Sequence, residues 1–411
     1  MDKLITAKLL LVAIIICCAF PIAADQERFV QDRFAIGFWV DPPADEKMDA
    51  RYSEIAQANF TMVLGGFGAS TPETVARQLE LCEKYDLKAV VWIAGDEPGQ
   101  LPQSPVCWGY KLRDEPNAKD FPGLRARVDA IRKVRPGKLA FINLFPNYAN
   151  ESQLGTPTYD EHVARFIKEV GTDVICMDHY PKFAPGGDGR KGYCTNLDAM
   201  RRHSLDAGIP FWNFFNTMPF GSQTDPTEAQ LRWQMYTSIA YGAKGLLYFC
   251  YYTPLSHEFP KGGAIITRDG RRTRHYLQAK RINADIRNLA PTLMQLTSTG
   301  VYRVTPDDDP AEVLDGSPVK DLGRAGYDPK HDILLGVFQH ADGRRAVMLN
   351  NYHFAYTAWP TVVFDADLAD VTEVDKETGK ERPVLDDSPD MEGLQLSFDA
   401  GEGRLFLMPG E

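Results

Sequence analysis

The tripeptide Asp-Glu-Pro occurs twice in the chain, at 96–98 in "GDEPGQ" and at 114–116 in "LRDEPN". Adjacent carboxylic acids can do acid/base chemistry, because one carboxyl group can donate a proton while a second, ionised one acts as base or nucleophile. The same tripeptide also begins helices and turns, since Asp or Glu caps a helix and Pro fits its first turn. The surrounding sequence therefore decides whether either copy is a candidate catalytic site.

The two copies lie in different surroundings. Asp114 and Glu115 follow "WGYKL", an apolar run typical of a buried strand, so we expect them at a strand end. Asp96 and Glu97 lie in "GDEPGQLPQSP", a link rich in Gly and Pro in which acidic turn residues are common. We therefore predict a functional role for Asp114 and Glu115, and only a turn at Asp96 and Glu97.

Short apolar runs alternate with amphipathic stretches from residue 34 to residue 252. The runs are nearly continuous in apolar residues, as expected of parallel strands that are buried on both faces. They span 34–40, 61–67, 88–94, 108–112, 138–145, 173–178, 210–216 and 245–252. Eight strands that alternate with helices predict an α/β fold, the (β/α)8 TIM barrel. The link between the third and fourth runs leaves little room for a full helix.

Helix signals fill most of the other gaps. Thr71 followed by Pro72 is a typical helix start, and Gly171 is a typical helix end. A long helix over 272–296 is predicted to close the barrel. Beyond about residue 300, strand-like runs separated by turn signals such as "ADGR" predict a small all-β, sandwich-like domain. The expected organisation is a signal peptide over 1–24, a barrel over 25–298 and a C-terminal β-domain over 299–411.

The active site of such a barrel is built from residues at the carboxyl ends of its strands. A third carboxylate, Asp178, ends the sixth run. Aromatic rings suit the apolar faces of sugars, and polar side chains suit their hydroxyl groups, so a carbohydrate substrate is expected. We interpret His179 as a hydrogen-bonded rim residue rather than a base. The predicted substrate-binding residues at these strand ends are Trp39, Tyr148, His179, Tyr180, Asn216, Tyr252 and Glu258.

The segment "SPVCWGYKLRDEPNAKDFPGL" resembles the fourth-strand motif of exported bacterial (β/α)8-barrel glycoside hydrolases. The stretch over 269–293 is similar to the helix that joins such barrels to a C-terminal β-domain. The resemblance implies a glycoside hydrolase that acts on a poly- or oligosaccharide. It also implies that Glu115 is the acid/base, in the position held by the Glu of Asn-Glu-Pro in many retaining glycosidases.

The seventh run departs from that family pattern. Retaining enzymes of the Asn-Glu-Pro kind carry a nucleophilic Glu there, whereas this chain has Asn216. The partner carboxylate could be Asp178, which we favour narrowly, or Glu258. It could also be Asp114, as in hexosaminidases in which an Asp beside the acid orients the substrate's own acetamido nucleophile. The remaining alternative is a catalytically inactive barrel that binds carbohydrate.

Two cations complicate the assignment of Glu115. Strict strand alternation would place Lys111, Arg113 and Glu115 on one face. Nearby cations lower the pKa of a carboxyl group, whereas a general acid needs a raised pKa. Either a second carboxylate compensates for these cations, or the alternation breaks before Glu115.

Composition and leader sequence limit the partners. The formal net charge of -11 over 411 residues argues against nucleic acid and anionic membranes as partners. Lys3 and Lys8, the apolar run over 9–20 and the small residues Ala23 and Ala24 are typical of a cleaved secretory signal. We expect cleavage after Ala24, a secreted or periplasmic protein, and no membrane attachment after cleavage.

Five of the seven cysteines lie beyond the leader. Cys176 and Cys250 lie in apolar runs and are predicted to be buried thiols. Cys107 and Cys194 have loop-like surroundings and could form one disulfide. The sequence contains no cysteine spacing typical of a metal site, no His-Glu-x-x-His motif and no phosphate-binding glycine loop of the usual kind. Neither a metal nor a cofactor is therefore predicted.

Overall fold

The computed structural model describes residues 27–92, 97–184, 186–255, 259, 263–322, 331–386 and 389–410. The predicted signal peptide, Asp96 and Glu258 lie outside these residues.

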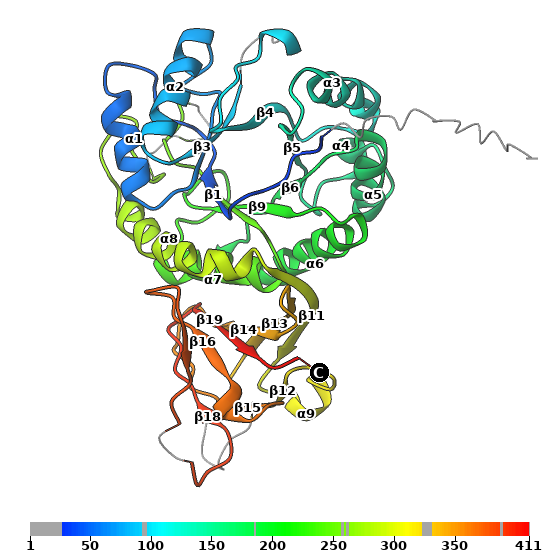
Figure 1. Cartoon of the computed structure of the whole chain (residues 1–411), viewed down its shortest axis with the longest axis vertical. Coiled ribbons are helices and arrows are strands. Elements are labelled where there is room, and N and C mark those ends of the chain that lie inside the picture. The colour runs from blue at the N-terminus through cyan, green and yellow to red at the C-terminus, as the bar shows by residue number, and fades with distance from the viewer. Residues whose placement is uncertain are drawn as a thin grey trace, which may run out of the picture.

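An eight-stranded parallel sheet curls into a barrel, which confirms the predicted (β/α)8 fold (Figure 1). The first and last strands of the sheet meet where the Thr61 N–H donates to the Ile36 carbonyl over 2.9 Å. In sheet order the strands are β1 (Ala35–Phe38), β10 (Gly245–Phe249), β9 (Phe211–Asn216), β6 (Ile175–Asp178), β5 (Leu139–Leu144), β4 (Cys107–Asp114), β3 (Lys88–Val91) and β2 (Met62–Leu64).

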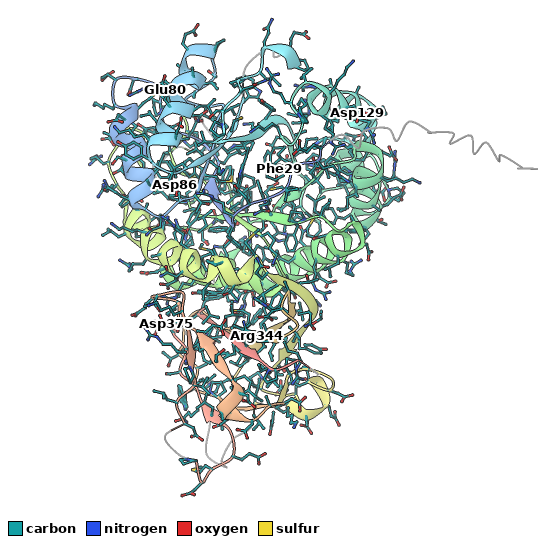
Figure 2. All side chains as sticks on the ribbon, viewed as in Figure 1. Phe29, Glu80, Asp86, Asp129, Arg344 and Asp375 are labelled. Carbon is teal, nitrogen blue, oxygen red and sulfur yellow. The ribbon has the colours of Figure 1, made fainter. Side chains whose placement is uncertain are left out.

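Helices surround the barrel, and charged side chains such as Glu80 and Asp129 lie on its outer surface (Figures 1 and 2). Thr71 caps the second helix as predicted, with its hydroxyl accepting from the Thr74 N–H. The link between β3 and β4 contains only the short turn η1 (Pro98–Gln100) among its described residues. The helices are α1 (Met48–Gln57), α2 (Pro72–Lys84), α3 (Phe121–Val134), α4 (Glu151–Leu154), α5 (Tyr159–Val170), α6 (Arg190–Ala207), α7 (Glu228–Ala240) and α8 (Arg274–Leu293), with the turn η2 (Ala118–Asp120) before α3.

The amino end of the barrel is plugged by the segment that precedes β1. Phe29 packs edge-on against Trp108, with ring centroids 5.7 Å apart (Figure 2). The Trp108 indole donates to Asp32 and the Trp212 indole donates to Gln31. These side chains fill the amino end of the barrel, so a site built on the strands is expected at their carboxyl ends.

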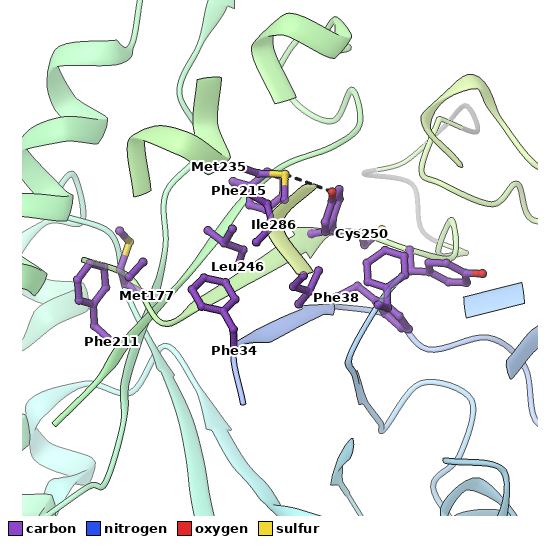
Figure 3. Packing of buried hydrophobic residues seen from close by; sticks show 14 of the residues in the cluster. Phe34, Phe38, Met177, Phe211, Phe215, Met235, Leu246, Cys250 and Ile286 are labelled. Carbon is purple, nitrogen blue, oxygen red and sulfur yellow. Dashed lines mark hydrogen bonds between the residues drawn. The ribbon is translucent and has the colours of Figure 1, made fainter. Parts of the chain in front are cut away.

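Bulky apolar side chains fill the space between the strands and the surrounding helices. Figure 3 shows Phe215 and Leu246, from β9 and β10, in one cluster with Met235 of α7 and Ile286 of α8. All four side chains are essentially inaccessible to solvent. This packing holds the strand ends, and therefore any site built on them, in fixed positions.

The chain beyond α8 forms the predicted β-structure. A six-stranded sheet contains β11 (Leu296–Val304), β13 (Ile333–His340), β14 (Arg345–Asn351), β19 (Gly403–Met408), β16 (Thr372–Val374) and β17 (Glu381–Pro383). A three-stranded sheet contains β12 (Val319–Asp321), β15 (Thr361–Phe364) and β18 (Leu394–Gln395). One apolar cluster includes residues of both sheets, as in a sandwich. The short elements α9 (Pro310–Val313) and η3 (Leu368–Asp370) lie in connections, and the hairpin β7 (Phe183–Ala184) and β8 (Gly187–Asp188) follows β6.

The five described cysteines all carry free thiols, so Cys107 and Cys194 do not form the disulfide that the sequence left open. Cys107 begins β4, whereas Cys194 lies on α6 with its sulfur 3.6 Å from the Tyr352 hydroxyl. Cys176 and Cys250 are buried as predicted. Within the described ranges, no helix has the length and apolar character needed to cross a membrane.

Candidate active site

Two aspartates and an asparagine meet at the carboxyl ends of β4, β5 and β6. Asp114 ends β4, Asp178 ends β6, and Asn143 lies between them on β5. The Asn143 amide donates to both carboxylates, over 3.1 Å to Asp114 Oδ1 and over 2.9 Å to Asp178 Oδ1. These two bonds limit the separation of the two aspartate oxygens to about 6 Å. The barrel therefore brings together two residues that are far apart in the sequence.

Glu115 adds a third carboxyl group to this site. Its backbone N–H donates to the Asn143 carbonyl over 2.9 Å, and its φ of 46° turns the chain out of the strand. Its charge acts on the pKa of Asp178, and the charge of Asp114 acts on the pKa of Glu115. The three predicted catalytic residues therefore form one electrostatically coupled group.

The three carboxyl groups differ in how readily they ionise. Burial, and then the charge of Asp114, raises the pKa of Glu115 to about 7. Burial, followed by the charges of Glu115 and Asp114, raises the pKa of Asp178 well above its usual range. Asp114 is open to solvent on one side. Burial of its inner side raises its pKa too, but the Asn143 amide and the cations of Lys111 and Arg113 oppose that rise. Near neutral pH Glu115 is therefore only partly ionised and burial disfavours the charged form of Asp178, whereas solvent access and two cations favour charge on Asp114.

An irregularity in β4 resolves the conflict over the neighbouring cations. The pairing of β4 with β5 shifts between Lys111 and Arg113, so the side chains do not alternate through this point. Arg113 is exposed, and its Nη2 lies 3.9 Å from Oδ2 of Asp120. Lys111 is partly buried within the barrel mouth. The pKa of Glu115 is consequently raised by its surroundings, and a general acid requires this direction.

Trp39 lies just beyond β1 on the opposite side of this mouth. The Lys111 ammonium lies 3.9 Å from the centroid of its indole ring, as in a cation–π contact. Phe67 and Phe214 contact Trp39 edge-on, with centroids 5.5 Å away in each case. Trp39 is only partly buried, and Phe67 is 49% exposed, so aromatic surface borders the entrance.

His179 and Tyr148 form a second part of the rim. The Asn196 amide oxygen accepts from the Asn147 N–H and lies 3.0 Å from Nδ1 of His179, which assigns the imidazole proton to Nδ1. Burial lowers the pKa of His179 to about 4, so the ring is neutral near pH 7. The Tyr148 ring packs edge-on against it at 5.0 Å and is 59% exposed. Tyr148 therefore presents an exposed aromatic ring near Asp178 and Glu115, whose charges act on its hydroxyl.

The other described residues that were predicted to bind substrate make contacts within the protein itself. Tyr180 packs against Phe249 and Phe220, with centroids 5.0 and 5.3 Å away. The Tyr252 hydroxyl donates to the Arg268 carbonyl. The Asn216 side chain is fully buried and bonds the backbone at Thr224 and Met218, so its amide is already occupied. Glu97 of the first Asp-Glu-Pro is exposed and precedes η1.

Sequence reasoning missed Asn143 and Lys111. Asn143 is a polar residue inside the otherwise apolar run "LAFINLF", and a buried polar side chain in a strand is a usable signal. From the sequence, Lys111 is only a cation that would lower the pKa of Glu115, because the direction of its side chain depends on the irregularity in β4. No group of three or more His, Cys, Asp or Glu residues in the described part of the chain is arranged to hold a metal ion.

A separate cavity of about 560 Å³ lies at the amino ends of β9 and β10, against β11. Lys244, Arg201 and Ser298 are among the residues that line it. Its one carboxylate, Asp173, is already bonded to Arg28 and Arg132. The residues that line this cavity therefore offer no unpaired carboxylate, and the carboxyl ends of the strands remain the candidate active site.

No protein-family profile matches the chain, and a search of curated proteins finds no relative. Among solved structures, it is similar to a catalytic mutant of a GH42 β-galactosidase from G. stearothermophilus, with a TM-score of 0.59 and 8% identity over 93% of this chain and 100% of that one. A β-galactosidase from Bacillus circulans sp. alkalophilus gives a TM-score of 0.58 at 10% identity, over 92% and 99% of the two chains. A β-galactosidase from the psychrophilic Marinomonas ef1 gives 0.48 at 10% identity, over 64% of this chain and 62% of that one. At such identities the likeness to the first two structures shows the fold alone: the protein has the barrel fold of these two glycoside hydrolases.

Proposed function

We propose that the protein is a glycoside hydrolase in which Glu115 donates the proton to the leaving-group oxygen. The observation that carries this proposal is the three-carboxylate group at the barrel mouth, in which Glu115 has a pKa of about 7. A general acid works best when its pKa is close to the working pH. The barrel fold shared with known glycosidases agrees with this reaction class but does not establish it.

We assign the ionised partner role to Asp114 rather than to Asp178. A nucleophile or charge-stabilising group must be ionised, and burial keeps the pKa of Asp178 well above its usual range. Asp114 has solvent access and two cations that favour its charged form. On this assignment Asp178 is a protonated neighbour that holds Asn143 in place. Direct paired-carboxylate chemistry with Asp178 is the competing assignment.

The two assignments predict different substrates. Asp114 is adjacent to the acid in sequence, so its most suitable task is to orient a 2-acetamido group that attacks the anomeric carbon. That route requires an N-acetylated amino sugar and proceeds with retention. If Asp178 is the partner, no acetamido group is needed, and its separation from Glu115 decides between retention and inversion.

The test compares Asp114→Asn and Asp178→Asn on aryl glycosides with and without a 2-acetamido group, with product anomers followed by NMR. We expect cleavage of the acetamido substrates with retention, and a loss on the order of a hundredfold in Asp114→Asn. Rescue of Asp178→Asn by azide, with a trapped glycosyl azide, would favour the competing assignment. Sugar binding without release of reducing ends from any substrate would mean that the barrel binds carbohydrate but does not cleave it.

A further inference from the structure

Lys111 has a cationic group in the barrel mouth that the proposed reaction does not use. It projects from β4, and its ammonium lies between two rings, 3.9 Å from the centroid of Trp39 and 4.7 Å from that of Phe67. Ring faces attract a cation but accept none of its three N–H groups in the usual way. Across the described part of the chain, no acceptor lies within hydrogen-bond or ion-pair distance of this ammonium.

The two described carboxylates whose charges act on this ammonium accept their hydrogen bonds from other groups. Both oxygens of Asp41 accept backbone N–H groups, from Phe67, Gly68 and Ala69 at 2.8 to 3.0 Å. Asp114 accepts from Asn143. Asp114 and Asp41 act on Lys111 only through space: they oppose the effect of burial, which lowers the pKa of Lys111 to about 8. The group is therefore largely cationic at neutral pH, and its N–H groups are available.

The surrounding backbone leaves room beside this ammonium. Gly66, just beyond β2, has a φ of 118°. A Cβ at this position would lie 3.4 Å from Lys111 Nζ and 3.2 Å from Trp92 Cβ. Any larger residue at this glycine would crowd the space next to the cation. Lys111 thus lies against aromatic rings at the same strand ends as the candidate catalytic residues, and no described residue accepts from its ammonium.

We propose that Lys111 binds an anionic oxygen group of the substrate, a sugar carboxylate or a sulfate ester, next to the scissile bond. This inference rests on the proposed glycosidase function and names its substrate class: acidic saccharides. A partly buried cation without a counter-ion gains most from a charged acceptor, because charge-assisted hydrogen bonds are about twice as strong as neutral ones. Glu115 has a pKa of about 7, and burial raises the pKa of Asp178 well above its usual range, so near neutral pH both repel such a group less than fully ionised carboxylates would.

The experiment measures kcat/KM on matched pairs of 4-nitrophenyl glycosides, in both anomeric forms. One pair is a 2-acetamido-2-deoxyhexuronide and the corresponding neutral N-acetylhexosaminide, and the other is an N-acetylhexosaminide with and without a 6-sulfate. We expect the wild type to favour the acidic member of one pair by about tenfold or more, and Lys111→Met to abolish most of that preference. The pair that responds identifies the group as carboxylate or sulfate. Lys119→Met, on the exposed turn η2, is the matched control and should leave the ratio unchanged.

The outcomes separate this inference from the proposed function. Cleavage that depends on Glu115 but favours neutral sugars, or an equal loss on both members in Lys111→Met, overturns the inference and leaves the glycosidase intact. If nothing is cleaved, the same acidic and neutral monosaccharides are tested by thermal shift. Stabilisation by the acidic sugar that disappears in Lys111→Met supports the inference while the proposed function falls. No difference between acidic and neutral sugars overturns the inference as well.

Discussion

Two residues at the barrel mouth have a positive φ, a backbone conformation that residues other than glycine rarely adopt. Val40, just beyond β1, has a φ of 64°, and Glu115, just beyond β4, has a φ of 46°. A positive φ is especially unfavourable for a β-branched residue, and such strain gathers at functional sites. At Glu115 the turn takes the carboxyl group out of the strand's alternation, to a place where Asp114 raises its pKa.

The pH dependence of activity follows from these carboxyl groups. Glu115 must hold its proton to act as an acid, so kcat/KM should fall as the pH rises through about 7. Asp114 must be ionised, so activity should also fall as the pH drops through the pKa of Asp114. That pKa is raised above the usual value for an aspartate. Initial rates on a substrate with a poor leaving group test this bell shape. A profile that is flat from pH 6 to 9 would contradict the role of Glu115.

The buried carboxyl group of Asp178 should cost stability as the pH rises above the value at which an unfolded aspartate ionises. Its pKa is higher in the folded chain than in the unfolded one, so its contribution to folding is present at low pH and lost as the pH rises. An amide can still accept the bond from Asn143. We therefore expect Asp178→Asn to melt higher than the wild type by roughly 2 °C or more at pH 8, and by less at pH 4.

Melting curves across this pH range measure the difference. Asp129→Asn, on the outer surface of α3, is the control and should show no such growth with pH. A difference for Asp178→Asn that stays constant with pH would show that the pKa of Asp178 is not raised in the folded protein relative to the unfolded one.

At the scale of elements, the sequence predicts which strands and helices are present better than it predicts their local geometry. The predicted fourth run, 108–112, became β4 over Cys107–Asp114, because the polar residues at its end still pair with β5. Apolar periodicity reports burial, which is why the eight runs and the helix starts could be predicted. It carries no information on the shift between Lys111 and Arg113, which is set by pairing between strands. The direction of Lys111, and the bridge made by Asn143, therefore emerged only from the folded barrel.

The Asn143 bridge on β5 can be tested through the pH profile. Its amide donates to the charged forms of Asp114 and Asp178 and so lowers both pKa values. In Asn143→Leu those pKa values rise, and the acidic limb of kcat/KM should move to higher pH and narrow the bell. Asn147→Ala, in the turn that follows β5, is the comparison variant. An unshifted acidic limb in Asn143→Leu would mean that the amide only supports packing.

At the scale of the whole molecule, the barrel and the C-terminal sheet share one core. Helix α7 packs on β13 and β14 (Figure 1). One apolar cluster contains Met235 of the barrel together with Leu334 and Met348 of the sheet. The Asn350 amide donates to the Tyr236 carbonyl across this contact. Such a buried interface should make the two parts unfold together rather than as independent domains.

Gly336 of β13 tests this shared core. A Cβ at Gly336 would lie 2.2 Å from the Ala240 carbonyl oxygen of α7, so the sheet must move away. We expect Gly336→Val to lower the free energy of unfolding by about 1–3 kcal/mol or more, measured by denaturant titration. Gly99→Ala, where an added Cβ meets nothing within 4 Å, should change it little. Equal stabilities of the two variants would show that the interface is looser than described.

The central claim is that Glu115 is the proton donor of a glycosidase, and a matched pair of variants tests it most directly. Glu115→Gln keeps the size of the side chain and removes the proton, whereas Glu97→Gln makes the same change in the exposed first Asp-Glu-Pro. On a saccharide with a poor leaving group, we predict that Glu115→Gln loses on the order of a hundredfold or more in kcat. It should lose much less on an aryl glycoside with a good leaving group, and Glu97→Gln should match the wild type on both. Wild-type turnover of the saccharide by Glu115→Gln would contradict the account.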